Sequence, residues 1–219
     1  MEDDVSGHFI TIEGGEGVGK STQARLLAER MRETGLTVVE VREPGGTPTG
    51  DRIREILLDP TVTMTARTEL FLYEAARAEL TATVIVPALS RGEIVVCDRF
   101  FDSSTAYQGY GRGLNVDVVR TLNLAATAGV CPDLTILLQL ETAEALRRAT
   151  TGGADRIEAE SLEFHRAVIE GFAILAADDP ARIVAIDASG TVDEVALRVW
   201  NIFNTHPVGE HATDGWPQS

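Results

Sequence analysis

The residues of this sequence with the clearest chemical potential form one glycine-rich run near the N-terminus, residues 14–21. The run fits Gly-x-x-x-x-Gly-Lys-Ser/Thr, the phosphate-binding loop, in which flexible glycines aim backbone N–H groups at phosphate oxygens. Lys20 would place a positive charge on the β- and γ-phosphates of ATP, and the Ser21 hydroxyl would hold Mg²⁺. The predicted ATP-binding residues are Gly14, Gly15, Glu16, Gly17, Val18, Gly19, Lys20, Ser21 and Thr22.

The segments on both sides of this loop support its assignment. Residues 9–12 form an apolar run typical of a strand, and residues 20–34 have the pattern of a helix. Because the helix begins at the loop, the positive end of its dipole adds to the attraction for phosphate. The alternative is a glycine-rich turn in an unrelated α/β protein, which would not need the strand, the Lys-Ser pair and the helix together.

A second candidate site follows the near-continuous apolar run at residues 93–98, which suits a parallel strand buried on both faces. Asp98 ends this strand, and the carboxyl ends of such strands form the edge where α/β proteins bind ligands. Beside a phosphate-binding loop, this carboxylate can orient Mg²⁺ or accept a proton, so Ser21 and Asp98 are the predicted metal ligands. Arg99 could grip a second phosphate through two N–H groups. The alternative is an aspartate that only caps the following turn.

Other side chains suit a nucleotide, although each has a simpler alternative. Arg54 can point toward the same sheet edge or be an ordinary surface residue. Tyr73 and Arg77 lie four residues apart in a predicted helix at 66–91, so they share a face, and a ring beside a planar donor suits a nucleobase. The alternative is a core aromatic residue beside a surface arginine. The amide of Gln108 can pair with a base edge, yet by itself it belongs to a polar loop.

Two arginines flank a small-residue segment, residues 150–154, late in the chain. Arg148 precedes the segment and Arg156 follows it. A basic lid at about 147–158 that closes over transferring phosphates would exclude water and stabilise charge. A plain surface hairpin is the alternative.

The elements that must position these residues alternate between strands and helices. Strands are expected at residues 9–12, 37–42, 93–98, 134–140 and 182–187, with helices between them and a polar, glycine-rich loop at 99–113. This alternation predicts an α/β fold with a five-stranded parallel sheet and helices on both faces. Residues 1–8 are expected to be a disordered acidic lead-in, residues 9–205 a single domain, and residues 206–219 a frayed tail.

Composition narrows the class of protein further. A net charge of −15 over 219 residues argues against binding to nucleic acid or to an anionic membrane surface. No apolar run approaches the roughly 18 residues of a membrane span, and the acidic N-terminus lacks the apolar core of a secretory signal. Two isolated cysteines favour a reduced, cytoplasmic protein.

Taken together, the sequence resembles the thymidylate kinases, which phosphorylate dTMP to dTDP with ATP. The motifs that carry the resemblance lie at residues 12–22, 42–47, 75–77, 98–100, 102–109, 111–113, 132–135 and 155–158. The Arg-Glu-Pro-Gly-Gly-Thr and Ala-Tyr-Gln-Gly runs are the most specific, since a phosphate-binding loop alone serves many functions. The resemblance implies a three-layer α/β/α P-loop kinase fold with a short lid, Mg²⁺ as cofactor, and a homodimer.

The resemblance also implies a dTMP site. Its expected members are Glu43, Arg54, Tyr73, Arg77, Arg99, Ser104, Tyr107 and Gln108. Arg77 and Gln108 would meet the thymine edge, with Tyr73 stacked on the base and Ser104 nearby. Arg54 and Arg99 would hold the phosphate, while Glu43 and Tyr107 would line the sugar.

One departure from the family pattern concerns the charge that assists phosphoryl transfer. Family members carry a catalytic arginine either in the lid or in the phosphate-binding loop, whereas this loop and the centre of this lid have none. Either Arg148 or Arg156 supplies the charge, or the rate is lower than in the family. The predicted catalytic residues are Lys20, Asp98, Arg99, Arg148 and Arg156.

Three other functions stay open from the sequence alone. They are another nucleotide or nucleoside kinase of the same fold, a P-loop ATPase or switch without a phosphoryl acceptor, and a catalytically weakened nucleotide-binding relative. Activity with different acceptors would separate them.

Overall fold

A five-stranded parallel sheet forms the centre of the computed structural model, which describes residues 7–149 and 155–209. The strand order is β2-β3-β1-β4-β5. The strands are β1 (Phe9–Gly14), β2 (Val38–Arg42), β3 (Ile94–Asp98), β4 (Leu134–Gln139) and β5 (Ile183–Asp187). The three inner strands are almost wholly buried, as expected for a parallel sheet covered on both faces. The predicted α/β fold with a five-stranded parallel sheet is therefore confirmed.

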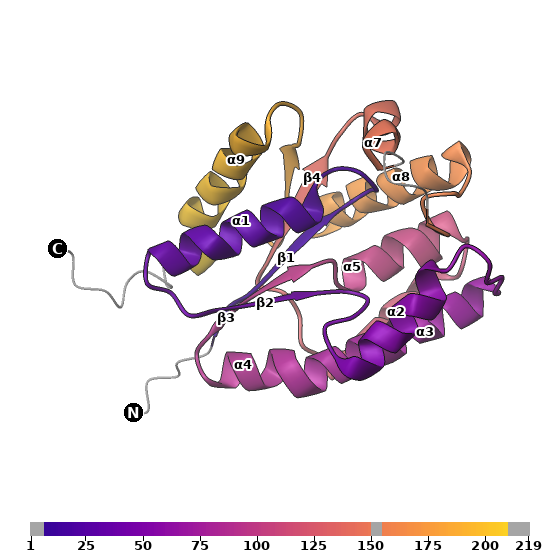
Figure 1. Cartoon of the computed structure of the whole chain (residues 1–219), viewed down its shortest axis with the longest axis horizontal. Coiled ribbons are helices and arrows are strands. Elements are labelled where there is room, and N and C mark those ends of the chain that lie inside the picture. Colours follow the sequence, from indigo (N-terminus) through magenta and orange to yellow (C-terminus); the bar gives the residue numbers. More distant parts are fainter. Residues whose placement is uncertain (1–6, 150–154, 210–219) are drawn as a thin grey trace.

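Helices cover both faces of this sheet (Figure 1). They are α1 (Lys20–Glu33), α2 (Pro48–Leu58), α3 (Ala66–Leu80), α4 (Val86–Ser90), α5 (Phe101–Ser104), α6 (Val116–Ala126), α7 (Thr142–Ala149), α8 (Leu162–Asp178) and α9 (Val192–Thr205). Two π-helical segments, η1 (Thr81–Ile85) and η2 (Thr105–Gly111), continue α3 and α5.

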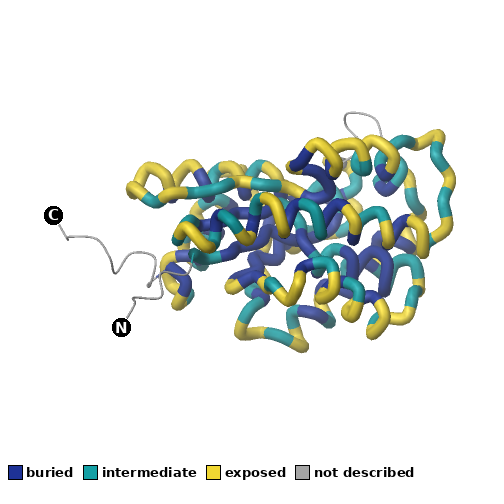
Figure 2. The backbone as a smooth tube through the Cα atoms, turned by 90° about the horizontal axis from the view of Figure 1, so that it is seen from below, coloured by how far each residue is buried: buried dark blue, intermediate teal, exposed yellow. Residues whose placement is uncertain are grey.

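Alternating residues of a strand pack against helices on opposite faces of the sheet. Ile10 and Ile12 of β1 pack in one cluster with α1 and α9, while Phe9 lies in another with η1 and α4. This alternation is the two-residue period of a strand. The buried stretches accordingly run through the middle of the molecule, with exposed stretches on the outer helices (Figure 2).

The segment at residues 99–113, expected to be a polar loop, is mostly helical, and that prediction was wrong. It forms α5 and η2, which pack against α8. Its glycines serve close packing: a Cβ on Gly111 would lie 2.8 Å from the Phe164 ring, and one on Gly171 of α8 would lie 2.7 Å from Tyr110. The glycines of this segment had indicated a loop. In the structure their small size instead allows the segment to pack closely against α8.

The helix expected at residues 66–91 is present but irregular, as α3, η1 and α4 in succession. The π-helical turn lies directly before Pro87, whose missing N–H and bulky ring interrupt the regular hydrogen-bond pattern. This proline therefore changes the winding of the helix without ending it.

The packed part of the chain extends beyond the limits expected at both ends. Gly7 N donates to Leu89 O at 3.0 Å, so the lead-in predicted to be disordered already contacts α4 at residue 7. At the other end, Val208 is 6% exposed and joins the core cluster of Phe203. Of the predicted lead-in, lid and tail, residues 1–6, 150–154 and 210–219 lie outside the described residues. Within residues 7–149 and 155–209, no helix is both long and apolar enough to cross a membrane.

Candidate active site

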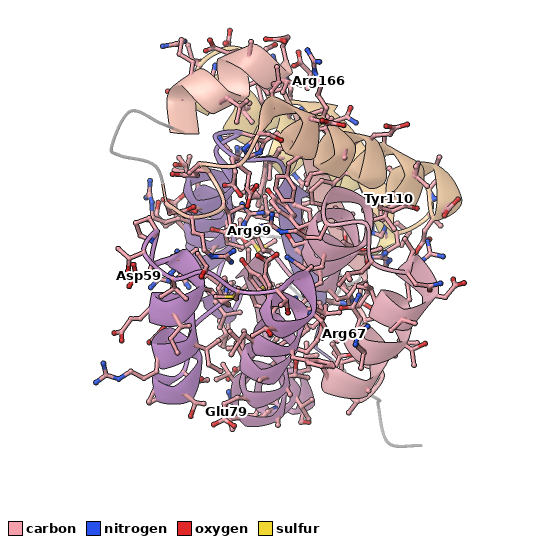
Figure 3. All side chains as sticks on the ribbon, turned by 90° about the vertical axis from the view of Figure 1, so that its right-hand side faces the viewer. Asp59, Arg67, Glu79, Arg99, Tyr110 and Arg166 are labelled. Atoms are coloured by element: carbon pink, nitrogen blue, oxygen red, sulfur yellow. The ribbon has the colours of Figure 1, made fainter. Side chains whose placement is uncertain are left out.

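A pocket of about 400 Å³ opens at the carboxyl ends of the strands, beside the loop that joins β1 to α1. Figure 3 looks toward this end of the molecule and shows Arg99 near its centre. The predicted residues in its wall are Glu16, Gly17, Gly19, Lys20, Ser21, Thr22, Glu43, Arg54, Tyr73, Asp98, Arg99, Ser104, Tyr107, Gln108 and Arg148. Gly14, Gly15 and Val18 line a smaller cavity below the loop. Arg77 and Arg156 line neither cavity.

The phosphate-binding loop has the backbone that its glycines predict. Gly17 and Gly19 have φ angles of 70° and 95°, in the left-handed region that favours glycine. Gly19 caps α1, so the N-terminus of that helix faces the pocket. Lys20 is 6% exposed, and its Nζ donates to Gly15 O at 2.5 Å. Burial and the nearby Arg99 lower the pKa of Lys20 to about 8, so a bound anion would favour its charged form.

Ser21 and Asp98 meet at the floor of the pocket. Ser21 Oγ donates to Asp98 Oδ2 at 2.5 Å, and Asp98 Oδ1 is buried without a hydrogen-bond partner among the described residues. One hydroxyl and one carboxylate with a spare oxygen fit Mg²⁺, which keeps several waters and binds few protein groups beside phosphates. The donor set is thus adequate for the ion expected from the sequence.

Arg99, Glu16 and Tyr107 form one polar group on the wall of the pocket. Arg99 Nη2 and the Tyr107 hydroxyl donate to Glu16 Oε1 at 2.6 and 2.8 Å. Burial would raise the pKa of Glu16, but Arg99, Lys20 and the Tyr107 hydroxyl lower it to about 2, so this carboxylate is ionised. The sequence placed Glu16 with ATP, whereas its side chain lies with the residues expected to hold the acceptor.

The backbone at Arg99 is strained. Its φ is 69°, a left-handed conformation that costs a residue with a side chain about 1–2 kcal/mol. Glu13 holds this turn, since Phe100 N donates to its Oε1 at 2.7 Å and Ser103 Oγ donates to its Oε2 at 2.6 Å. Glu13 was not singled out from the sequence, although a carboxylate at the end of β1 is the same signal that identified Asp98.

Three arginines, Arg42, Arg54 and Arg99, also line the pocket. Arg54 Nη1 donates to Pro44 O at 3.0 Å, and burial, followed by the charge of Arg42, lowers its pKa. Arg42 also lines the pocket, together with Arg99. Sequence reasoning gave Arg42 no role, although it ends β2 directly before a loop, where ligand-binding residues are expected.

Arg77 lies behind the pocket in a buried ionic cluster. Its Nε donates to Glu43 Oε2 at 2.9 Å, and its Nη1 donates to Glu74 Oε1 at 2.7 Å and Asn123 Oδ1 at 3.1 Å. Only 1% of Arg77 is exposed. Arg77 thus does not line the pocket, but it donates to Glu43, which does. The contact between Arg77 and the thymine edge stays a prediction. Ser104, Tyr73 and Gln108 form the neighbouring wall.

The two arginines of the expected lid have different surroundings. Arg148, at the end of α7, lines the pocket, and its Nε donates to Glu144 Oε1 at 2.9 Å. Arg156 is turned into the protein, where its Nε donates to Leu57 O at 2.7 Å and its Nη1 to Glu69 Oε2 at 2.6 Å. Of the two, only Arg148 lines the pocket.

Buried Glu13 predicts a pH dependence of stability. Burial, followed by the charge of Asp102, raises the pKa of Glu13 from 4.5 to about 7. The folded state therefore favours the protonated form, and this contribution is complete below pH 4.5 and is lost as the pH rises toward 7. The free energy of unfolding would be measured by urea denaturation at pH 5 and at pH 8. Between these pH values it should fall by about 2–3 kcal/mol more in the wild type than in a Glu13→Gln variant. Parallel pH profiles for the two proteins would contradict this assignment.

These features define a class of protein. A phosphate-binding loop after the first strand, a carboxylate at the end of β3 and a sheet of order β2-β3-β1-β4-β5 are the elements of a P-loop kinase. Arginines that line the same pocket, together with an aromatic ring and an amide, are suited to a nucleoside monophosphate acceptor.

Comparison with known proteins narrows the class to one family. The thymidylate kinase family model matches residues 12–199. The thymidylate kinase of Synechococcus sp. (strain JA-3-3Ab) is 54% identical over 196 residues, which cover 89% of this chain and 94% of that protein. The thymidylate kinase of Deinococcus radiodurans is 48% identical over 195 residues, which cover 89% of this chain and 95% of that protein. The crystal structure of thymidylate kinase from Ehrlichia chaffeensis matches with a TM-score of 0.76 and 33% identity, covering 91% of this chain and 100% of that one. The chain belongs to the thymidylate kinase family.

Proposed function

We propose that this protein transfers the γ-phosphoryl group of ATP to dTMP, giving dTDP and ADP. The observation that carries the proposal is a single pocket lined both by a P-loop with Lys20 and by further cationic side chains, Arg54 and Arg99 among them. Membership of the thymidylate kinase family supports the choice of dTMP as acceptor.

The proposed reaction is an in-line displacement. A phosphate oxygen of dTMP attacks the γ-phosphorus, the bond from that phosphorus to the β,γ-bridging oxygen breaks, and ADP leaves with the electron pair. The dTMP phosphate is already ionised, so no strong general base is required. Catalysis then consists mainly of holding the two phosphates in line and stabilising charge on the transferring group.

The residues of the pocket divide this work. Lys20 stabilises the donor phosphates, while Arg54 and Arg99 hold the acceptor phosphate and offset its charge. Arg148 adds positive charge from the α7 side. Ser21 and Asp98 would hold Mg²⁺, which, when bound, neutralises phosphate charge and orients the oxygens.

The remaining wall is suited to a thymidine group. The ring of Tyr73 would stack on the base. Glu43 and Tyr107 would line the sugar. The Ser104 hydroxyl is buried without a partner in the described part of the chain, and it lies in the wall with Gln108. A buried hydroxyl without a hydrogen-bond partner destabilises the folded protein. A polar ligand atom that pairs with this hydroxyl would therefore stabilise the complex.

We also propose a cytoplasmic homodimer. Helix α3 contacts both α2 and α6, and each of the three carries an exposed apolar side chain: Ile56 is 46%, Phe71 51% and Val118 54% exposed. Exposed apolar side chains on neighbouring helices suit a protein–protein contact. Sedimentation at the monomer mass would contradict the dimer. The cytoplasm supplies ATP, and Cys97 and Cys131 are free thiols.

An acceptor series tests the proposed function. ADP formation would be measured with ATP and Mg²⁺ and, in turn, dTMP, dUMP, dCMP, dGMP, AMP or no acceptor. We expect fast turnover with dTMP and little with dCMP, dGMP or AMP. A preference for another acceptor would favour a related kinase, and ADP formation without acceptor would favour an ATPase. Binding of dTMP without turnover would favour a catalytically weakened relative.

A further inference from the structure

The carboxylate of Glu69 receives donors from three side chains that are distant in the sequence. Gln108 Nε2 donates to its Oε1 at 2.8 Å. Arg112 Nη2 and Arg156 Nη1 donate to its Oε2 at 2.9 and 2.6 Å. Glu69 is only 1% exposed, and it lies in the first turn of α3. A carboxylate buried between two guanidinium groups is held in its ionised form.

This arrangement fixes the orientation of the Gln108 amide. An ionised carboxylate only accepts hydrogen bonds, so the amide must turn its NH₂ group toward Glu69. The carbonyl oxygen of Gln108 is then directed away from Glu69. Gln108 is 1% exposed and belongs to the pocket wall beside Tyr73 and Ser104. The pocket therefore has an acceptor of fixed direction next to the expected base.

Amide orientation decides which pyrimidine the pocket can pair with. A glutamine that rotates freely by 180° can match either base edge, because it has one acceptor and one donor group. Thymine and uracil present an N3–H donor, whereas cytosine presents an N3 lone pair beside an amino group. An oxygen fixed toward the base accepts a hydrogen bond from the N3–H of thymine, but it faces the N3 lone pair of cytosine. Two buried acceptors that face each other weaken binding, so cytosine is disfavoured.

We propose that Glu69 is a positioning residue that sets acceptor specificity. It holds the Gln108 amide in one orientation, so that the site takes a pyrimidine monophosphate with a protonated N3 and rejects a cytidylate. The inference rests on the proposed function, because it assumes that the base of the acceptor lies against Gln108. Glu69 itself does not line the pocket and acts only through its neighbour.

The test measures binding, so that it does not depend on turnover. Dissociation constants of dTMP and dCMP would be measured by calorimetry for the wild type and for Glu69→Gln. The carboxamide introduced at position 69 can present either its oxygen or its NH₂ group to Gln108. The amide of Gln108 is then free to adopt either orientation. We expect the preference for dTMP over dCMP to fall by about tenfold or more, mainly through tighter binding of dCMP.

Glu160→Gln is the matched control. Glu160 accepts from Arg112 Nη1 at 2.5 Å, so this variant removes a carboxylate from the same ionic network without touching Gln108. Its preference for dTMP should equal that of the wild type. If Glu160→Gln changes the preference as much as Glu69→Gln does, a general weakening of the network is responsible and the proposal is wrong.

A second variant keeps the proposal testable if Glu69→Gln does not fold. Gln108→Ala removes the oriented amide itself and should lose the same discrimination. In a Gln108→Ala background, Glu69→Gln should change the preference no further. An unchanged preference in Gln108→Ala or in a folded Glu69→Gln would overturn the proposal. The proposed function would fail by a different result, namely that the wild type forms no dTDP.

Discussion

An Arg148→Ala variant should lose about 10³-fold in kcat. An arginine that meets the transferring phosphoryl group contributes 10³–10⁵ to the rate in other phosphoryl-transfer enzymes. Among the described residues of the expected lid, Arg148 is the arginine that lines the pocket. Steady-state kinetics with ATP and dTMP would measure the loss. Binding of dTMP should change little, because the interaction is made mainly in the transition state.

Two neighbouring arginines provide the controls for this prediction. Arg147 also pairs with Glu144, at 2.8 Å, but is 70% exposed and does not line the pocket, so Arg147→Ala should retain kcat. Arg156→Ala should act mainly on stability, because the guanidinium is tied to Glu69 and to Leu57 O. If Arg156→Ala abolished turnover and Arg148→Ala did not, the assignment of the two arginines would be reversed.

A Lys20→Ala variant should lower kcat by about 10²- to 10³-fold, the usual effect of removing one preorganised positive group from a reacting centre. Lys20 is the only lysine in the sequence, and its pKa is lowered to about 8 by burial and by Arg99. Kinetics would measure the loss, while dTMP binding should persist because the acceptor wall is intact. Near-normal kcat in Lys20→Ala would contradict the role of this loop.

The single lysine also allows a direct probe of donor binding in the wild type. An amine-directed acylating reagent has one lysine side chain to modify, and mass spectrometry reads the result at residue 20. ATP should protect Lys20, whereas dTMP alone should protect it less. Equal modification with and without ATP would place the donor phosphates elsewhere.

The strands and the P-loop could be predicted because their signals are local. Each strand is a short run rich in apolar residues, the three inner strands are almost wholly buried, and the observed bounds differ from the expected ones by only one or two residues. Asp98 and Arg99 were predictable for the same reason, since the end of a parallel strand is also the ligand-binding edge of the sheet.

The contacts of the site residues could not be predicted, because they join distant segments. The Tyr73–Arg77 spacing indicated a shared helix face, but it could not show that Glu43, 34 residues from Arg77, takes up the guanidinium. Likewise, nothing local indicated that Glu69 meets Gln108, 39 residues away. The π-helical winding of η2 depends on packing against α8, and a glycine-rich sequence alone suggested a loop.

The most direct test of the account is the fate of the γ-phosphoryl group. The wild-type protein would be incubated with Mg²⁺, dTMP and ATP labelled in the γ-phosphate, and the products would be separated by chromatography. We expect the label to move to dTDP in step with ADP formation, with little inorganic phosphate. Label found as inorganic phosphate, with no labelled dTDP, would contradict the claim that this pocket holds donor and acceptor together.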